Sequence, residues 1–113
     1  MTMNAYCIFD LREIVDGEKL QAYSRDVLAT VQAHGGRYLS VGGNCRVVEG
    51  SWSPEFLVLI EFPGFEQARA WYDSDDYAAL KDLRRQGSRG DAVMIEPEAG
   101  PLRDYLIGSA RGR

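Results

Sequence analysis

Two side chains beside the first Gly-Gly pair are candidates for proton transfer and anion binding. His34 precedes Gly35, and a histidine with an unperturbed pKa of about 6.5 can shuttle protons near neutral pH. At the end of a helix the same ring can instead serve as a cap that the helix dipole favours. Arg37 follows, and its planar guanidinium can hold a carboxylate ligand through two hydrogen bonds. It can equally pair with Glu61 or Glu49 across a sheet.

Glu61 is the one acidic residue in the apolar run Phe56–Phe62. An ionised carboxylate buried there would need a partner, and a raised pKa would make it a general base. If the side chain instead points to the edge of the sheet, it is an ordinary exposed carboxylate. The residue types therefore predict His34 and Glu61 as catalytic candidates, with Arg37 orienting an anion.

Aromatic side chains offer a lining for a ligand pocket, although the same rings can simply fill a core. A buried phenol or indole N–H needs a hydrogen-bond partner, which favours a cleft of mixed polarity. We expect ligand-binding roles, together with Arg37, for Tyr23, Tyr38, Trp52, Trp71, Tyr72 and Tyr77. Arg69 and Arg84 are expected to make ion pairs at the surface or between subunits.

Composition and motif spacing exclude several other classes. One histidine cannot build a His-rich zinc site or a two-His iron site within one chain, so we expect no metal and no cofactor. The net charge of −4 argues against a nucleic-acid partner. Cys7 and Cys45 form no CxxC motif and fit a reducing cytoplasm. No apolar run approaches the roughly 20 residues of a membrane span, and no signal peptide is expected.

The spacing of apolar residues predicts the elements that must position these groups. Asp16 is expected to cap a helix that ends at Gly35-Gly36, and Ser74 to cap the second piece of a later helical region. The expected strands and helices are Ala5–Phe9, a helix from Asp16 to Gly35, one broken strand over Arg37–Val41 and Arg46–Glu49, Phe56–Phe62, helical pieces Phe65–Tyr72 and Asp75–Arg85, a loop over Gly87–Gly90, and Ala92–Ile95.

This order, β-α-β-β-α-β, predicts an α+β, ferredoxin-like fold with a four-stranded antiparallel sheet. One domain over residues 1–97 is expected, followed by a tail over 98–113 that either docks or frays. Both helices cover one face, yet the strand Phe56–Phe62 is apolar on both faces, so the other face needs a cover. A second copy packed face to face would supply it, giving a homodimer. The alternative is that the tail folds back over the sheet.

Four short segments and one tyrosine form an ordered series that resembles a known bacterial family. They are His34–Leu39, Val48–Trp52, Ile60–Pro63, Ala68–Ser74 and Tyr77. The series is similar to the family named domain of unknown function 1330, over about Asn4 to Glu96. The resemblance implies the dimeric α/β barrel superfamily, in which two ferredoxin-like sheets pack together and each subunit keeps a cleft. Relatives there include cofactor-independent monooxygenases, small isomerases and haem proteins.

Two functional hypotheses from different classes follow. In the first, a cleft lined by aromatic rings and closed by Arg37, His34 and Glu61 binds a small aromatic or carboxylated metabolite. If that protein is an enzyme, cofactor-independent proton transfer or oxygenation is the expected reaction. In the second, a noncatalytic dimeric module serves structure or ligand sensing, and the same rings only fill the core. A third hypothesis gives the basic tail a nucleic-acid or regulatory partner.

Overall fold

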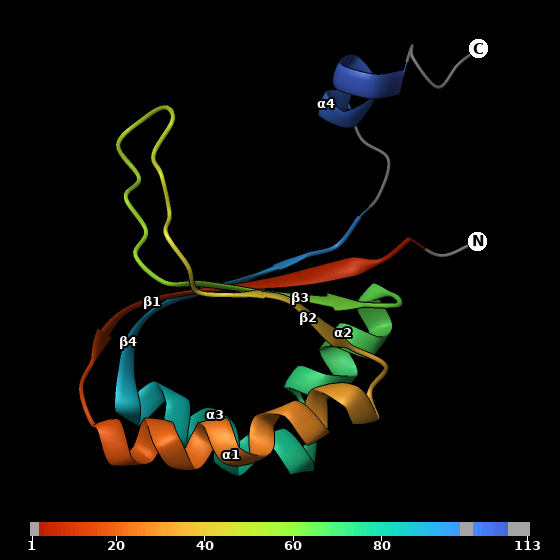
Figure 1. The fold of residues 1–113 in the computed structure, drawn as a ribbon. Coiled ribbons are helices and arrows are strands. Elements are labelled where there is room, and N and C mark those ends of the chain that lie inside the picture. Colours follow the sequence, from red (N-terminus) through yellow and green to blue (C-terminus); the bar gives the residue numbers. More distant parts are fainter. Residues whose placement is uncertain (1–2, 98–100, 109–113) are drawn as a thin grey trace.

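The fold is a four-stranded antiparallel sheet with helices on one face, as the element order predicted. A computed structural model describes residues 3–97 and 101–108. The sheet has the order β2-β3-β1-β4, and Figure 1 shows the helices Gly17–Ala33, Phe65–Tyr72 and Asp75–Gly87 below it. The elements are β1 (Ala5–Ile14), α1 (Gly17–Ala33), β2 (Arg37–Val41), β3 (Leu57–Phe62), α2 (Phe65–Tyr72), α3 (Asp75–Gly87), β4 (Ser88–Ile95), α4 (Pro101–Arg103) and the short π-helical turn η1 (Asp104–Gly108). The fold class is therefore α+β and ferredoxin-like.

Local signals place the two long helices. The Asp16 side chain accepts a hydrogen bond from the backbone N–H of Lys19, at 3.2 Å, and so caps the start of α1. The helix stops where Gly35 takes a φ of +80°, a left-handed conformation that glycine adopts at little cost. Ser74 caps α3 in the same way, accepting from the N–H of Tyr77 at 3.1 Å. Both predicted caps are confirmed.

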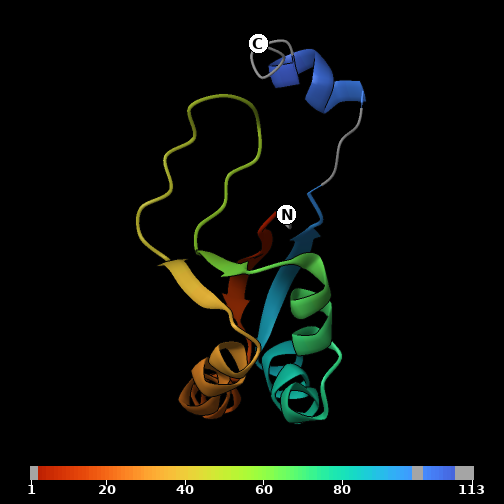
Figure 2. The same ribbon diagram turned by 90° about the vertical axis from the view of Figure 1, so that its right-hand side faces the viewer.

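The prediction of a strand over Arg46–Glu49, the second half of the expected broken strand, is wrong. Residues 42–56 form one long loop that leaves the sheet on the side away from the helices (Figure 2). A hydrogen bond of 2.7 Å from the Gly42 N–H to the Leu57 carbonyl closes its base. Gly42 has a φ of +73°, and a side chain there would collide with the ring of Phe56. This turn directs the chain out of the sheet, so the β-forming residues Arg46–Glu49 find no strand to pair with.

Two further boundaries differ from expectation. The predicted loop Gly87–Gly90 is wrong, since the chain passes directly from α3 into β4. The first strand runs to Ile14 rather than Phe9, because its polar second half pairs with the first half of β4. A bulge between Leu11 and Glu13 adjusts that pairing.

Strand alternation sends two different sets of side chains to the two faces of the sheet. The face that meets the helices carries Cys7 and Phe9 from β1 and Ile60 and Phe62 from β3, all buried. They pack with Trp71 and other buried residues into one core cluster. The opposite face, called the outer face below, carries an apolar row of Ile8, Leu57, Leu59, Val93 and Ile95.

Part of the tail forms α4 and η1, which Figure 1 shows standing away from the sheet. The side chains of Leu102, Tyr105 and Leu106 are exposed there. Residues 98–100 and 109–113 of the tail, which was expected to dock or fray, lie outside the described residues.

Candidate functional site

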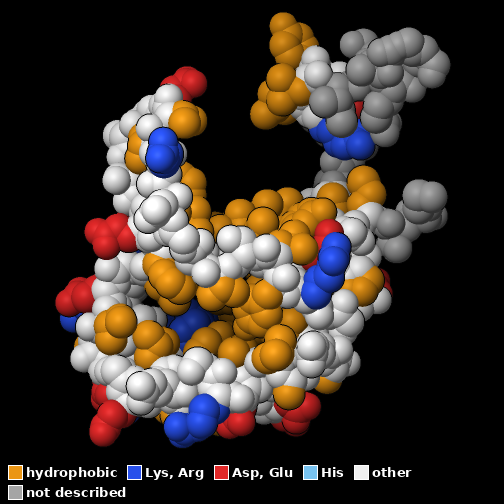
Figure 3. All heavy atoms as spheres, viewed as in Figure 1, with side chains coloured by type: hydrophobic (Ala, Val, Ile, Leu, Met, Phe, Trp, Pro, Cys, Tyr) orange, Lys and Arg blue, Asp and Glu red, His pale blue; other side chains and the backbone are white. Residues whose placement is uncertain are grey.

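A cavity of about 530 Å³ lies between the sheet and the two long helices. Figure 3 shows its opening, with hydrophobic side chains around it and a basic side chain at its depth. Strands β1, β2 and β3 form one wall and α1 and α3 the other. Its walls consist of Phe9, Leu11, Leu20, Tyr23, Ser24, Val27, Leu28, Tyr38, Val41, Phe56, Val58, Ile60 and Arg84. Within that described lining, the polar side chains are two phenols, one hydroxyl and one guanidinium.

The guanidinium belongs to Arg84 of α3, and its position corrects the expectation of a surface or intersubunit ion pair. Arg84 is only 8% exposed. Its Nε donates a hydrogen bond of 3.2 Å to the Tyr77 hydroxyl, and its guanidinium carbon lies 4.9 Å from the ring centre of Phe9. No carboxylate among the described residues forms a salt bridge with it. The cavity thus contains a buried cation that has no acidic partner within residues 3–97 and 101–108.

Three tyrosine hydroxyls lie in or next to the cavity. Tyr23 and Tyr38 line it, and the hydroxyl of Tyr77 lies 3.1 Å behind that of Tyr23. Burial raises the pKa of Tyr38 to about 12 and raises those of Tyr23 and Tyr77 above the ordinary value. All three hydroxyls therefore remain protonated at neutral pH and act there as hydrogen-bond donors or acceptors rather than as bases.

The remaining aromatic candidates lie outside the cavity. Trp71 is fully buried in the core, where its indole N–H donates to Thr30 Oγ1 at 3.0 Å. Tyr72 packs beside it, with Lys81 Nζ 4.1 Å from its ring centre. Trp52 lies in the 42–56 loop and donates a hydrogen bond of 3.2 Å to Asp10. Asp10 points to the outer face, because side chains alternate along β1 and its neighbour Phe9 is buried on the face that meets the helices.

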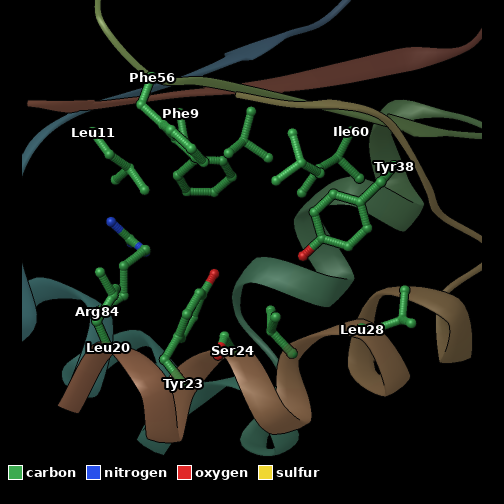
Figure 4. A pocket seen from close by; sticks show the side chains of 13 residues that line it. Phe9, Leu11, Leu20, Tyr23, Ser24, Leu28, Tyr38, Phe56, Ile60 and Arg84 are labelled. Carbon is green, nitrogen blue, oxygen red and sulfur yellow. The ribbon is translucent and has the colours of Figure 1, made fainter. Parts of the chain in front are cut away.

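The structure does not place His34, Arg37 or Glu61 in the cavity lining. His34 is the C-terminal cap of α1, and its Nδ1 lies 3.0 Å from the carbonyl of Thr30. Arg37 is directly opposite Glu61 on neighbouring strands, and its Nε donates to that carboxylate at 2.8 Å. Figure 4 accordingly shows none of the three among the cavity side chains.

Glu61 has the surroundings of a stable anion. Arg37 donates to one of its oxygens, and Tyr6 and Asn4 donate to the other, at 3.2 and 3.0 Å. The hydrogen bond from Arg37, followed by those from Tyr6 and Asn4, holds the pKa of this carboxyl below its usual value. A lowered pKa weakens a carboxylate as a base, so this arrangement opposes the role of general base.

Sequence reasoning missed Arg84 as a site residue, although a signal was present. Tyr77, Leu80 and Arg84 are spaced three and four residues apart, which puts them on one face of a helix. Tyr77 and Leu80 are buried, so Arg84 is buried with them. The contributions of Phe9 and Phe56 were also missed, because they depend on how the strands and the loop base meet the helices.

Two other features are absent from the part of the chain that the structure describes. Among residues 3–97 and 101–108, no group of three or more His, Cys, Asp or Glu side chains is placed to hold a metal ion. No helix in the same part of the chain is long and apolar enough to cross a membrane.

The fold and the cavity define the class of protein first: a small ferredoxin-like α+β domain with a ligand-sized space between its sheet and its helices. The family follows from the sequence. The model of the family described as "Domain of unknown function (DUF1330)" matches residues 4–97, and this chain belongs to that family. The resemblance stated from the motifs is confirmed. A comparison with curated proteins found no match.

Solved structures with the same fold are distant in sequence. A protein of unknown function from Rhodopseudomonas palustris is 14% identical, with a TM-score of 0.66 over 88% of this chain and 86% of that one. A protein of unknown function from Thermobifida fusca, described as dimeric and ferredoxin-like, is 17% identical, with a TM-score of 0.55 over 86% and 93%. SnoaB, a cofactor-independent oxygenase from Streptomyces nogalater, is 7% identical, with a TM-score of 0.51 over 86% and 93%. These similarities show the fold.

Proposed function

We propose that this protein binds a small, mostly apolar metabolite, aromatic or carboxylated, in the cavity between the sheet and α1 and α3. The volume of about 530 Å³ carries the proposal. Small-molecule sites typically enclose roughly 300 to 1,000 Å³, with apolar walls and a few polar groups that orient the ligand. A noncatalytic module whose aromatic rings only fill the core would have no such space.

The polar groups favour binding over acid–base catalysis. Among the described lining residues there is no carboxylate, imidazole, amine or thiol, and the phenols keep their protons at neutral pH. Proton transfer or oxygenation without a cofactor, with His34 or Glu61 as base, would require one of these side chains to reach the cavity. Neither lines it. The similarity to a cofactor-independent oxygenase is one of fold, so binding is the function that the geometry supports best.

The assembly that we propose is a homodimer joined through the outer face. The apolar row there includes Val93, 57% exposed, and Ile95, 42% exposed. Figure 3 shows hydrophobic side chains along this face, between the 42–56 loop and the C-terminal segment. A continuous apolar surface of this kind typically marks a protein–protein contact. The Thermobifida fusca protein of the same fold is described as dimeric, which supports the same arrangement here.

A neutral fluorescent probe tests the binding proposal. N-phenyl-1-naphthylamine should bind saturably, with enhanced emission, because its rings fit an apolar cavity. Ser24→Trp places a large ring at the lining and should abolish the enhancement. Arg25→Trp, on the next residue of α1 and outside the lining, is the matched control and should bind like the wild type. Thermal unfolding verifies that both variants fold. Absence of saturable binding, or equal binding by the two variants, would overturn the proposal.

Sedimentation velocity tests the dimer. The wild type should sediment as a dimer at micromolar concentration, and Val93→Lys should shift it to a monomer, because a charge would be buried at the contact. Ala79→Lys, on an exposed position of α3, should leave the dimer intact. A wild-type monomer would refute this part of the proposal without affecting the binding experiment.

A further inference from the structure

Arg84, which has no acidic partner among the described residues, indicates the charge that a ligand in the cavity should carry. A guanidinium has five N–H donors, and one of those of Arg84 is used by the Tyr77 hydroxyl. Its terminal nitrogens extend toward the space between Leu11, Phe9 and Tyr23 (Figure 4). A buried charge is costly unless it is paired and hydrogen-bonded. The described protein residues provide the phenol and the Phe9 ring but no anion.

The hydrogen bonds that link Arg84, Tyr77 and Tyr23 can make the Tyr23 hydroxyl a second donor to the cavity. The Tyr77 oxygen accepts from Arg84 Nε and lies 3.1 Å from the Tyr23 oxygen. When the Tyr77 hydroxyl donates to Tyr23, the proton of Tyr23 is free to point into the cavity. An anion beside Arg84 favours this orientation, because it accepts hydrogen bonds and donates none. Arg84 and Tyr23 would then hold the same anionic group from two sides.

The opposite wall supplies a third polar contact. The Tyr38 hydroxyl points across the cavity from β2 (Figure 4), and it has no hydrogen-bond partner among the described residues. Between the polar ends, the walls are apolar rings and aliphatic side chains. This arrangement suits a ligand with an apolar body, one acidic group at the Arg84 end and room for one further acceptor near Tyr38.

We infer that Arg84 is the binding residue for the carboxylate of a monoanionic ligand whose apolar body fills the cavity. The inference rests on the proposed function and adds the ligand class. One cation balances one negative charge, so a monocarboxylate is favoured over a phosphate ester with two charges. In a site of low polarity, a two-pronged pair between guanidinium and carboxylate is among the stronger polar contacts. This assigns to Arg84 the anion-orienting role expected of Arg37.

The test compares two probes of the same shape, 2-naphthoate and the neutral 2-naphthamide, by displacement of N-phenyl-1-naphthylamine at pH 7.5. The wild type should bind the carboxylate about tenfold or more tightly than the amide, since a charge-assisted pair is at stake. In Arg84→Gln this preference should disappear, while affinity for the neutral probe stays within about threefold. Arg84→Lys keeps the charge and should keep part of the preference. Arg85→Gln, on the exposed next residue of α3, is the matched control.

The outcomes separate the two proposals. If no probe binds the folded wild type, the proposed function fails. If the amide binds as tightly as the carboxylate in the wild type, or the preference survives in Arg84→Gln, the cavity binds ligands but the assignment of Arg84 is wrong. Thermal unfolding shows whether Arg84→Gln folds. If it does not, the wild-type comparison and Arg84→Lys decide: a preference that is reduced but not lost in Arg84→Lys, at unchanged affinity for the neutral probe, would support the assignment, and an undiminished preference would overturn it.

Discussion

The raised pKa of Tyr38 predicts how the free energy of unfolding should change at high pH, and this change can be measured. Burial raises the pKa of Tyr38 from 10.0 to about 12. Below about pH 10, Tyr38 keeps its proton in both the folded and the unfolded chain, so its ionisation does not lower the free energy of unfolding. As the pH rises from about 10 through about 12, the unfolded chain ionises first, so stability is lost over this window. A shift of two units corresponds to about 2.7 kcal/mol, which partial exposure of the ring to solvent reduces to about 1 to 2 kcal/mol.

The measurement is urea unfolding at pH 8 and pH 11.5, for the wild type and Tyr38→Phe. Other groups also titrate in this range, so the difference between the two proteins isolates Tyr38. The wild type should lose about 1 to 2 kcal/mol more than Tyr38→Phe between the two pH values. Tyr105→Phe, which removes an exposed hydroxyl in η1, should behave like the wild type. Equal losses in wild type and Tyr38→Phe would refute the conclusion that this phenol is held protonated in the cavity.

Three further predictions concern groups outside the cavity. Thr30→Val should lower the free energy of unfolding by about 1 to 3 kcal/mol, because the buried indole N–H of Trp71 loses its acceptor; Thr30→Ser keeps the hydroxyl, and an equal loss in it would point to another cause. Arg37→Ala should move the titration of Glu61, followed by carboxyl NMR, to higher pH, because the largest cause of its lowered pKa is removed; probe binding should not change, and a loss of binding would return Arg37 to the site. Burial raises the pKa of Cys7 to about 11, so iodoacetamide at pH 7.5 should modify this thiol in urea but not in the folded protein, and mass spectrometry of the folded sample showing modified Cys7 would contradict its burial.

The features that could be predicted are those encoded over a few residues. Asp16 and Ser74 stand at the right distance before their helices, and a cap requires no distant partner. The order of strands and helices followed from apolar spacing for the same reason. If Arg37 made an ion pair across the sheet, the sequence offered Glu61 or Glu49 as its partner. Only the register between β2 and β3, set by distant parts of the chain, selects Glu61.

A cleft was predicted, but the volume and the lining of the cavity could not be, because empty space is a property of packing between elements. Both depend on the distance of α1 and α3 from the sheet, and this distance cannot be inferred from the residue types alone. Arg84 was recoverable in part, since its helical spacing from Tyr77 is visible in the sequence. The strand expected over Arg46–Glu49 failed for the opposite reason. Local propensity favours a strand, but the turn at Gly42 takes the chain where no partner lies.

Strand β1 and the 42–56 loop each contact both faces of the sheet. Asp10 fastens Trp52 against the outer face, while Phe9 and Leu11, its immediate neighbours in the chain, form part of the cavity wall. Four residues beyond Trp52, the loop re-enters the sheet with Phe56 in that same wall. The hydrogen bond between Trp52 and Asp10 thus joins two segments that each contribute side chains to the cavity wall. If the outer face forms the dimer contact that we propose, a substitution there that displaces Trp52 is therefore also expected to change ligand binding in the cavity.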